Sequence, residues 1–249
     1  MDEMSRLRSV IRFGVVAAVV AMTLPFATAS LMAQRSVPKP NEGETFKDTS
    51  MLKPPAGAKI AIIEFEDMEC PMCAHVFPIV HAAAAHYNIP LMQHDFPLQY
   101  HLWSLDAMIW ARYLEDKVSP KMGDEYRGAV FAAQTGIASK DDMLNFTRRY
   151  FQSHGLQLPF VPDPTGQFKK EVEADRTLGE RLGVQYTPSI IVCTQKEWVH
   201  VTDVSLLYQT IDELEAKVRA EAPAKKAATP PAKKAATAPA KKAAAAPAK

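Results

Sequence analysis

Apolar residues along this chain form strand-length runs and helical patterns in mixed order. Continuous or alternating apolar runs of strand length cover residues 60–65, 89–96, 189–193 and 198–201. Apolar spacings of three and four, typical of amphipathic helices, cover residues 71–87, 102–115, 120–134, 139–153, 165–182 and 203–219. The pattern predicts an α/β protein with the order strand, helix, strand, block of helices, strand, strand, helix.

Two cysteines two residues apart lie where the first predicted strand passes into the first predicted helix. They belong to the stretch Cys70-Pro71-Met72-Cys73. Unpaired N–H groups and the positive end of the dipole at a helix start favour a thiolate at Cys70. A thiolate attacks disulfides, and a low pKa also makes it a good leaving group. We therefore expect Cys70 to be the nucleophile and the shielded Cys73 to resolve the mixed disulfide.

A structural zinc site is the alternative that uses the same cysteine spacing. Such a site normally needs four nitrogen or sulfur ligands. The chain has three cysteines, and Cys193 lies in a predicted late strand, where it reads as a small buried residue with a free thiol. No metal and no cofactor is therefore expected.

The first residues have the pattern of a secretory signal. Three arginines precede an apolar stretch at residues 13–26, and the small residues Ala27 and Ala29 match a cleavage site. We expect residues 1–29 to be a signal peptide, with an uncleaved membrane anchor as the alternative. Both readings place the domain in an exported, periplasmic or extracytoplasmic location, where disulfide formation is needed.

Two further segments differ from the predicted domain at residues 58–220. Residues 30–57 are polar and rich in proline, and read as a linker with a short lead-in strand. Residues 221–249 repeat Ala, Pro and Lys with a period of eight and lack the large apolar side chains that would offset the entropy of folding. This tail is predicted to be disordered.

The charge of the chain is unevenly distributed. The net charge is +1, but residues 222–249 have seven lysines and no acid, and residues 1–29 have a net charge of +1, so residues 30–221 carry −7. The basic tail can contact anionic surfaces. No aromatic residue interleaves its lysines, so no specific nucleic acid is expected.

The chain resembles the thioredoxin superfamily, and most closely its exported DsbA-like branch, over residues 58–220. The resemblance rests on the C-x-x-C at the first helix, Glu64 six residues before Cys70, the Asp-Phe-Pro-Leu at residues 95–98, and Thr187-Pro188 before a late strand. It implies a thioredoxin-like fold with an inserted helical domain at about residues 99–182.

The same resemblance implies roles for three residues outside the cysteine motif. Pro188 should be cis and lie beside the disulfide, and the backbone of Thr187 should pair with an extended substrate segment. An ordinary trans proline at an edge strand is the alternative. Glu64 should help to deprotonate Cys73, unless it is a water-facing glutamate on an edge strand.

Residues near the cysteines should tune their reactivity. Pro71-Met72 departs from the Pro-His pair of the strongest DsbA-type oxidants, and Met72 cannot donate a hydrogen bond to the Cys70 thiolate. A less extreme oxidant is therefore expected. The acids at 66, 67 and 69 should raise the thiol pKa if they lie near the sulfur.

These patterns predict a thiol:disulfide oxidoreductase that introduces or exchanges disulfides in exported proteins. Its substrates would be reduced exported proteins, and a membrane redox partner would reoxidise the dithiol. Isomerase or reductase activity is one alternative. Another is a thioredoxin-like Cu(I) delivery protein, because Met68, Cys70, Met72, Cys73 and His75 are suited to Cu(I). A third alternative is a non-catalytic adhesion module carried by the lysine tail.

Overall fold

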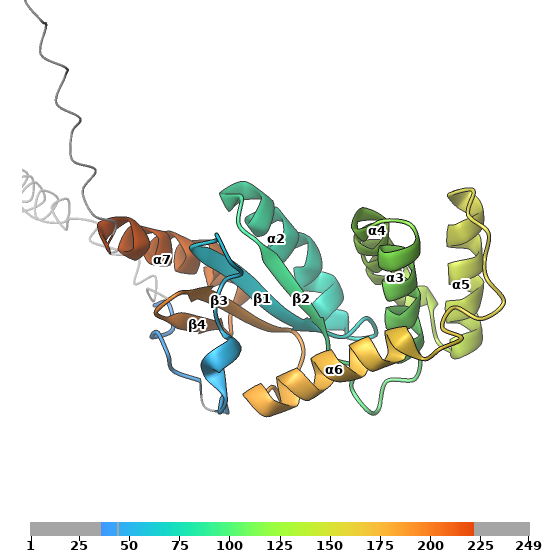
Figure 1. Cartoon of the computed structure of the whole chain (residues 1–249), viewed down its shortest axis with the longest axis horizontal. Coiled ribbons are helices and arrows are strands. Elements are labelled where there is room, and N and C mark those ends of the chain that lie inside the picture. Colours follow the sequence, from blue (N-terminus) through green and yellow to red (C-terminus); the bar gives the residue numbers. More distant parts are fainter. Residues whose placement is uncertain (1–35, 44, 222–249) are drawn as a thin grey trace, which may run out of the picture.

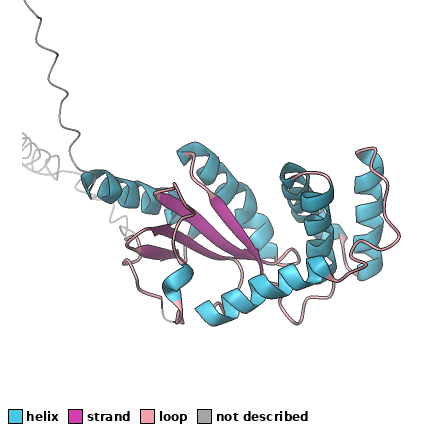
Figure 2. Cartoon of the chain, viewed as in Figure 1, coloured by secondary structure: helices cyan, strands magenta, loops and turns pink. Residues whose placement is uncertain are grey.

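A four-stranded sheet with the order β2-β1-β3-β4 organises the molecule (Figure 1, Figure 2). The structure is a computed structural model that describes residues 36–43 and 45–221. β1 pairs in parallel with β2 and antiparallel with β3, which pairs antiparallel with β4. The strands are β1 (Ile60–Glu66), β2 (Leu91–Asp95), β3 (Ser189–Thr194) and β4 (Trp198–Val201).

Helices cover both faces of the sheet and form a block beside it (Figure 1). The helices α2 (Pro71–Tyr87) and α7 (Leu207–Glu221) lie on one face, and α6 (Gln167–Leu182) reaches from the other face to the block. The block contains α3 (Ser104–Lys117), α4 (Pro120–Ala133) and α5 (Lys140–Ser153). Within the described residues, short 3-10 helices form at η2 (Thr49–Met51), η3 (Gln134–Gly136) and η4 (Val204–Leu206).

Side-chain alternation along β1 determines which helices cover each face of the sheet. Successive strand residues point to opposite faces. Ile60 and Ile62 pack in one core with Val76 and Val80 of α2, whereas the odd-numbered β1 residues pack with Leu182 of α6. The residues that follow Ile62 at every second position, 64 and 66, therefore face α2.

A third core lies within the helical block and reaches the cysteines. It contains Cys70 and Cys73 together with Trp103, Tyr126 and Phe151. The helical block therefore packs directly against the start of α2 and is part of the environment of the cysteine motif.

The expected α/β class and element order are confirmed, with element ends shifted by up to a few residues. The predicted lead-in strand before residue 58 is wrong among the described residues: the segment forms η2 and two hydrogen bonds between Asn41 and Trp198. Asn41 has a φ of 58° and follows two nearby prolines, which disfavours an extended pairing strand. The closing helix begins as η4 and continues as α7.

Two sequence predictions fall outside the described residues. The signal peptide or anchor at residues 1–29 lies there, as does all of the lysine-rich tail except residue 221. Within residues 36–43 and 45–221, none of the helices combines the length and hydropathy needed to cross a bilayer.

Gly179 in α6 is predicted to be required by close packing against the sheet. A Cβ at this position would lie 2.6 Å from a Phe96 ring carbon and 3.0 Å from a Phe65 ring carbon. Overpacking a core costs about 1–3 kcal/mol, which exceeds the gain of up to ~1 kcal/mol in helix propensity. Gly179→Ala should therefore lower the free energy of unfolding, measured by chemical denaturation.

Gly136→Ala is the matched control, because a Cβ there meets no atom of the described chain within 4 Å. It should leave the free energy of unfolding almost unchanged. Equal or greater stability of Gly179→Ala relative to the unsubstituted protein would contradict the packing argument.

Candidate active site

Cys70 lies at the junction of the active-site loop and α2. It is the N-cap residue of α2, with extended backbone angles, and Pro71 occupies the first turn. The side chain is 7 % exposed, and its thiol donates to the carbonyl oxygen of Thr187 at 3.4 Å. The structure therefore places the first sulfur between a helix start and the loop before β3.

The environment of Cys70 favours its thiolate. A hydrogen bond from the Cys73 side chain is the largest cause that lowers the Cys70 pKa, and the backbone N–H groups of Cys73 and Met72 contribute in the same direction. Burial opposes them, and the resulting pKa of Cys70 is about 6, well below the usual range of a cysteine thiol. The expected activation at the helix start is thus present.

Cys73 has the opposite environment. Its side chain is fully buried in the first full turn of α2, and Asp67 donates its backbone N–H to the sulfur at 3.4 Å. Burial raises the pKa of Cys73 strongly, and the neighbouring Cys70 and the charge of Glu66 raise it further. Cys73 is therefore a shielded thiol, as expected from its place one turn into the helix.

The loop before β3 brings Thr187 and Pro188 to Cys70. The Thr187-Pro188 peptide bond is cis, as the resemblance to the thioredoxin superfamily implied, and the trans alternative is wrong. Ser189 donates its hydroxyl to the carbonyl of Tyr186 at 2.7 Å, which closes the turn around the proline. Tyr186, just before this turn, is 47 % exposed, and its hydroxyl lies 3.4 Å from the Nε2 atom of His200.

Glu64 lies on the central strand β1. It pairs with Gln93 of β2 on one side and Ile190 of β3 on the other, so the edge-strand reading is wrong. Its carboxyl is fully buried, and neither oxygen has a hydrogen-bond partner among the described residues. Burial, and secondly the charge of Glu66, raises the Glu64 pKa well above its usual range.

The three acids before Cys70 bind the helical insertion. Asp67 accepts a bond from the N–H of Leu98 at 2.6 Å, and Glu69 accepts the N–H of Trp103 at 2.7 Å. Glu66 accepts from Arg127 at 3.1 Å. Glu66 raises the pKa of Cys73, as expected for an acid near a thiol, whereas the pKa of Cys70 is lowered overall.

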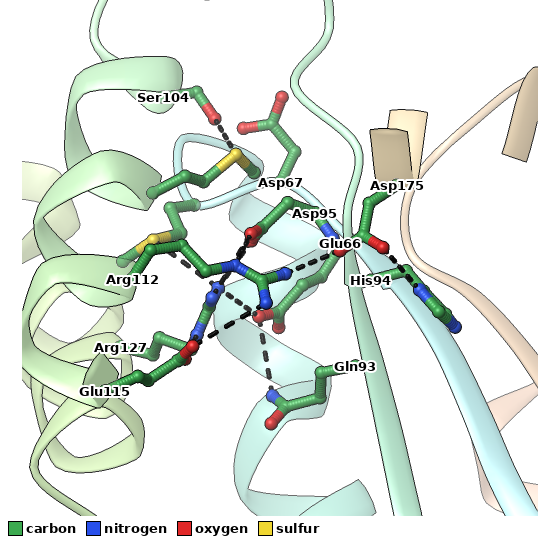
Figure 3. Close-up of polar contacts among 12 residues, drawn as sticks. Glu66, Asp67, Gln93, His94, Asp95, Ser104, Arg112, Glu115, Arg127 and Asp175 are labelled. Carbon is green, nitrogen blue, oxygen red and sulfur yellow. Dashed lines mark hydrogen bonds and ion pairs between the residues drawn. The ribbon is translucent and has the colours of Figure 1, made fainter. Parts of the chain in front are cut away.

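Arg127 and Gln134 are site residues that the sequence analysis missed. Arg127 is fully buried in α4 and bonds Asp95 at 2.6 Å as well as Glu66 (Figure 3). Gln134 donates its amide to the carbonyls of Met68 and Cys70, both at 3.0 Å. Both come from the insertion, more than fifty residues after the motif, and no local pattern distinguishes them.

The residues considered for Cu(I) are split between buried and exposed positions. Met68 is fully buried with its sulfur 4.0 Å from Arg127, whereas the side chains of Met72 and His75 are exposed. Within the described part of the chain, no group of three or more His, Cys, Asp or Glu is arranged to hold a metal ion. All three cysteines are free thiols.

Comparison with known proteins matches the geometry. The family model described as Thioredoxin matches residues 49–213. A search of curated proteins gave no match.

The solved structures similar to this chain have a DsbA-like fold at low sequence identity. The α-DsbA1 of Wolbachia pipientis is 16 % identical with a TM-score of 0.55, over 68 % of this chain and 92 % of that chain. The thiol-disulfide exchange protein α-DsbA2 of Wolbachia pipientis is 18 % identical, with a TM-score of 0.52 over 65 % of this chain and 85 % of that one. ScsC of Proteus mirabilis in a transitional conformation is 17 % identical, with a TM-score of 0.51 over 66 % of this chain and 71 % of that chain.

These comparisons confirm the predicted fold, a thioredoxin-like sheet with an added helical block. The C-x-x-C pair occupies the start of the first helix after the first strand, beside the cis proline. The chain belongs to the thioredoxin family, and it carries a Cys70-Cys73 pair on a DsbA-like fold.

Proposed function

We propose that the protein introduces or exchanges disulfides in exported proteins through the Cys70-Cys73 dithiol. The observation that carries the proposal is the position of the Cys70 sulfur at the start of α2, 3.4 Å from the carbonyl oxygen of Thr187. This contact supports a reaction in which the backbone at Thr187 and Pro188 aligns an extended substrate segment over Cys70. The signal-like first 29 residues support an exported location.

The exchange proceeds in two reversible attacks at sulfur. When the protein acts as an oxidant, a substrate thiolate attacks Cys70 in the disulfide, and Cys73 leaves and takes up a proton. A second substrate thiolate then attacks the substrate sulfur of the mixed disulfide, and Cys70 leaves as a thiolate. Two electrons pass from the substrate thiols to the protein. The lowered pKa of Cys70 makes it a good leaving group from the mixed disulfide in this second attack.

Glu64 is the proton donor and acceptor for Cys73 in this proposal. It faces α2 from the central strand, and its raised pKa keeps a proton in a region without other hydrogen-bond partners among the described residues. In the oxidising direction Glu64 supplies the proton that Cys73 takes up, and in the reducing direction it accepts that proton.

Cys70→Ser should abolish disulfide formation in a reduced two-cysteine peptide mixed with oxidised protein, because the leaving sulfur is absent. The measurement is the mass change of the peptide over time. Cys193→Ala is the matched control, since Cys193 lies fully buried in β3 and should be dispensable. Activity that survives in Cys70→Ser would remove the proposed mechanism.

The rate at which iodoacetamide alkylates Cys70 should rise with pH and reach half of its maximum near pH 6, because the pKa of Cys70 is about 6. A free cysteine has its midpoint near pH 8.5. The measurement is the rate of alkylation of the reduced protein from pH 4 to pH 9, with the site identified by mass spectrometry. Cys73→Ala should move the midpoint upward, because the Cys73 side chain is the largest cause of the lowered pKa. A wild-type midpoint above pH 8 would contradict the thiolate.

Met72→His should make the protein more oxidising, because an imidazole N–H can stabilise the Cys70 thiolate of the reduced form, which Met72 cannot do. A tenfold change in the equilibrium constant corresponds to about 30 mV, and we expect a rise of that order or larger. The measurement is equilibration with glutathione, and Met72→Leu is the control that keeps an apolar side chain. An unchanged potential in Met72→His would exclude residue 72 as a tuning residue.

A further inference from the structure

We propose that Glu66, held by Arg127 of the helical insertion, is a positioning residue that controls the ionisation of Cys73. The inference rests on the proposed dithiol exchange and extends it to a second buried carboxyl group. Through Glu66, the insertion would determine how easily the shielded half of the dithiol becomes a thiolate.

Strand geometry places Glu66 on the same side of the sheet as Cys73. Glu64 and Glu66 continue the β1 face that begins with Ile60 and Ile62 and packs against α2. Cys73 lies on the buried stripe of α2 that continues through Val76 and Val80. The residue next to Glu66, Asp67, donates its N–H to the Cys73 sulfur at 3.4 Å, so the end of β1 touches the sulfur directly.

The contacts of Glu66 fix its carboxyl group and leave it able to titrate. One oxygen accepts from Arg127 at 3.1 Å and faces the Gln93 amide at 3.4 Å, while the other has no hydrogen-bond partner among the described residues (Figure 3). Arg127 also binds Asp95 and Glu115, so its positive charge is shared among three carboxyl groups. Glu66 is therefore only partly neutralised.

The protonation of Glu66 changes within the physiological range. Burial raises its pKa to about 7 and outweighs the opposing charge of Arg127. Ionised Glu66 in turn raises the pKa values of Cys73 and Glu64. When Glu66 is protonated, below pH 7, the pKa of Cys73 is therefore lower. When Glu66 is ionised, above pH 7, its negative charge raises the pKa of Cys73 and favours the thiol.

Charged and titratable groups face Glu66 from every neighbouring element. They are Glu64 of β1, Asp95 of β2, Cys73 and His81 of α2, Arg127 and Asp124 of α4, and, through Arg127 and Asp95, Arg112 and Glu115 of α3. His81 and Asp124 also line an open surface hollow with Gln93. Gln93, whose amide lies 3.4 Å from the Glu66 carboxyl group, connects the buried cluster with this hollow.

The experiment measures the resolving step with a small aryl disulfide, 5,5′-dithiobis(2-nitrobenzoic acid). Cys70 attacks this reagent and releases one aryl thiolate. Cys73 then attacks the Cys70 sulfur of the mixed disulfide, which forms the protein disulfide and releases the second aryl thiolate. Two electrons pass from the dithiol to the reagent, and both thiol protons reach solvent, that of Cys73 by way of Glu64. The second absorbance phase reports the ionisation of Cys73.

In the unsubstituted protein, the rate of the second phase should rise less than tenfold per pH unit around pH 7. Glu66→Gln should restore the tenfold rise, with a rate equal to wild type at pH 6 and about tenfold higher at pH 8, because a like charge shifts a neighbouring pKa by about one unit or more. A merely structural role would change the rate alike at both pH values.

Glu115→Gln is the matched control, because it removes another carboxyl partner of Arg127 at 3.2 Å without removing a charge from the β1 face below Cys73. In Glu115→Gln, the rate of the second phase should still rise less than tenfold per pH unit around pH 7, as in the unsubstituted protein. A tenfold rise per pH unit through pH 7 in the unsubstituted protein would overturn the inference, whether or not Glu66→Gln folds. A slower or uniformly shifted second phase in folded Glu66→Gln would also overturn it.

The two proposals fail in different ways. If the protein does not exchange dithiols, the unsubstituted protein releases no second aryl thiolate at any pH, and the proposed function fails. If it releases both aryl thiolates and the rate of the second phase rises tenfold per pH unit through pH 7, the dithiol chemistry stands and only the control by Glu66 fails.

Discussion

The buried guanidinium of Arg127 is the interaction that joins the helical insertion to the thioredoxin sheet. It reaches from α4 to the ends of β1 and β2, where it binds Glu66 and Asp95. Removing one partner from such a network leaves a buried charge unpaired and typically costs about 3–5 kcal/mol, although an apolar replacement of the whole network can be equally stable. The network therefore specifies how the two parts meet more than it adds net stability.

The acids beside the motif extend this junction to the active-site loop. Asp67 accepts backbone N–H groups of Glu69 and Leu98, and Glu69 accepts those of Trp103 and Ser104 at the start of α3. Hydrogen bonds that backbone N–H groups donate to a carboxylate are among the stronger ones in proteins. The loop that orients Cys70 is thus held by the first turn of the insertion, so a shift of the insertion would move the dithiol.

The sequence was sufficient for features that depend on neighbouring residues. The place of Cys70 at a helix start and the burial of Cys73 follow from the change of apolar period around the motif, and the cis bond at Pro188 followed from a family resemblance. The position of Glu64 on an inner strand could not be predicted, because it depends on β2 and β3 lying on either side of β1.

Charge partners were the least predictable feature. The acids at 66, 67 and 69 form one acidic stretch in the sequence, but each finds partners in the insertion, about 30 to 60 residues away. Arg127 lies among other charged residues of α4, and nothing in its local pattern separates it from an exposed helix arginine. Arg127 becomes a buried charge that needs carboxylate partners only when α4 packs against the sheet and removes its guanidinium from water.

The contrast between the two sulfurs explains how one short motif supports an ordered reaction. A lowered pKa makes Cys70 the sulfur that attacks and leaves most readily, while burial keeps Cys73 protonated until the mixed disulfide has formed. If both sulfurs shared one environment, either could react first and the complex with substrate could form at the buried position. The helix start provides one environment, and the strand face with its two carboxyl groups provides the other. The order of the two attacks is therefore a consequence of where β1 ends and α2 begins.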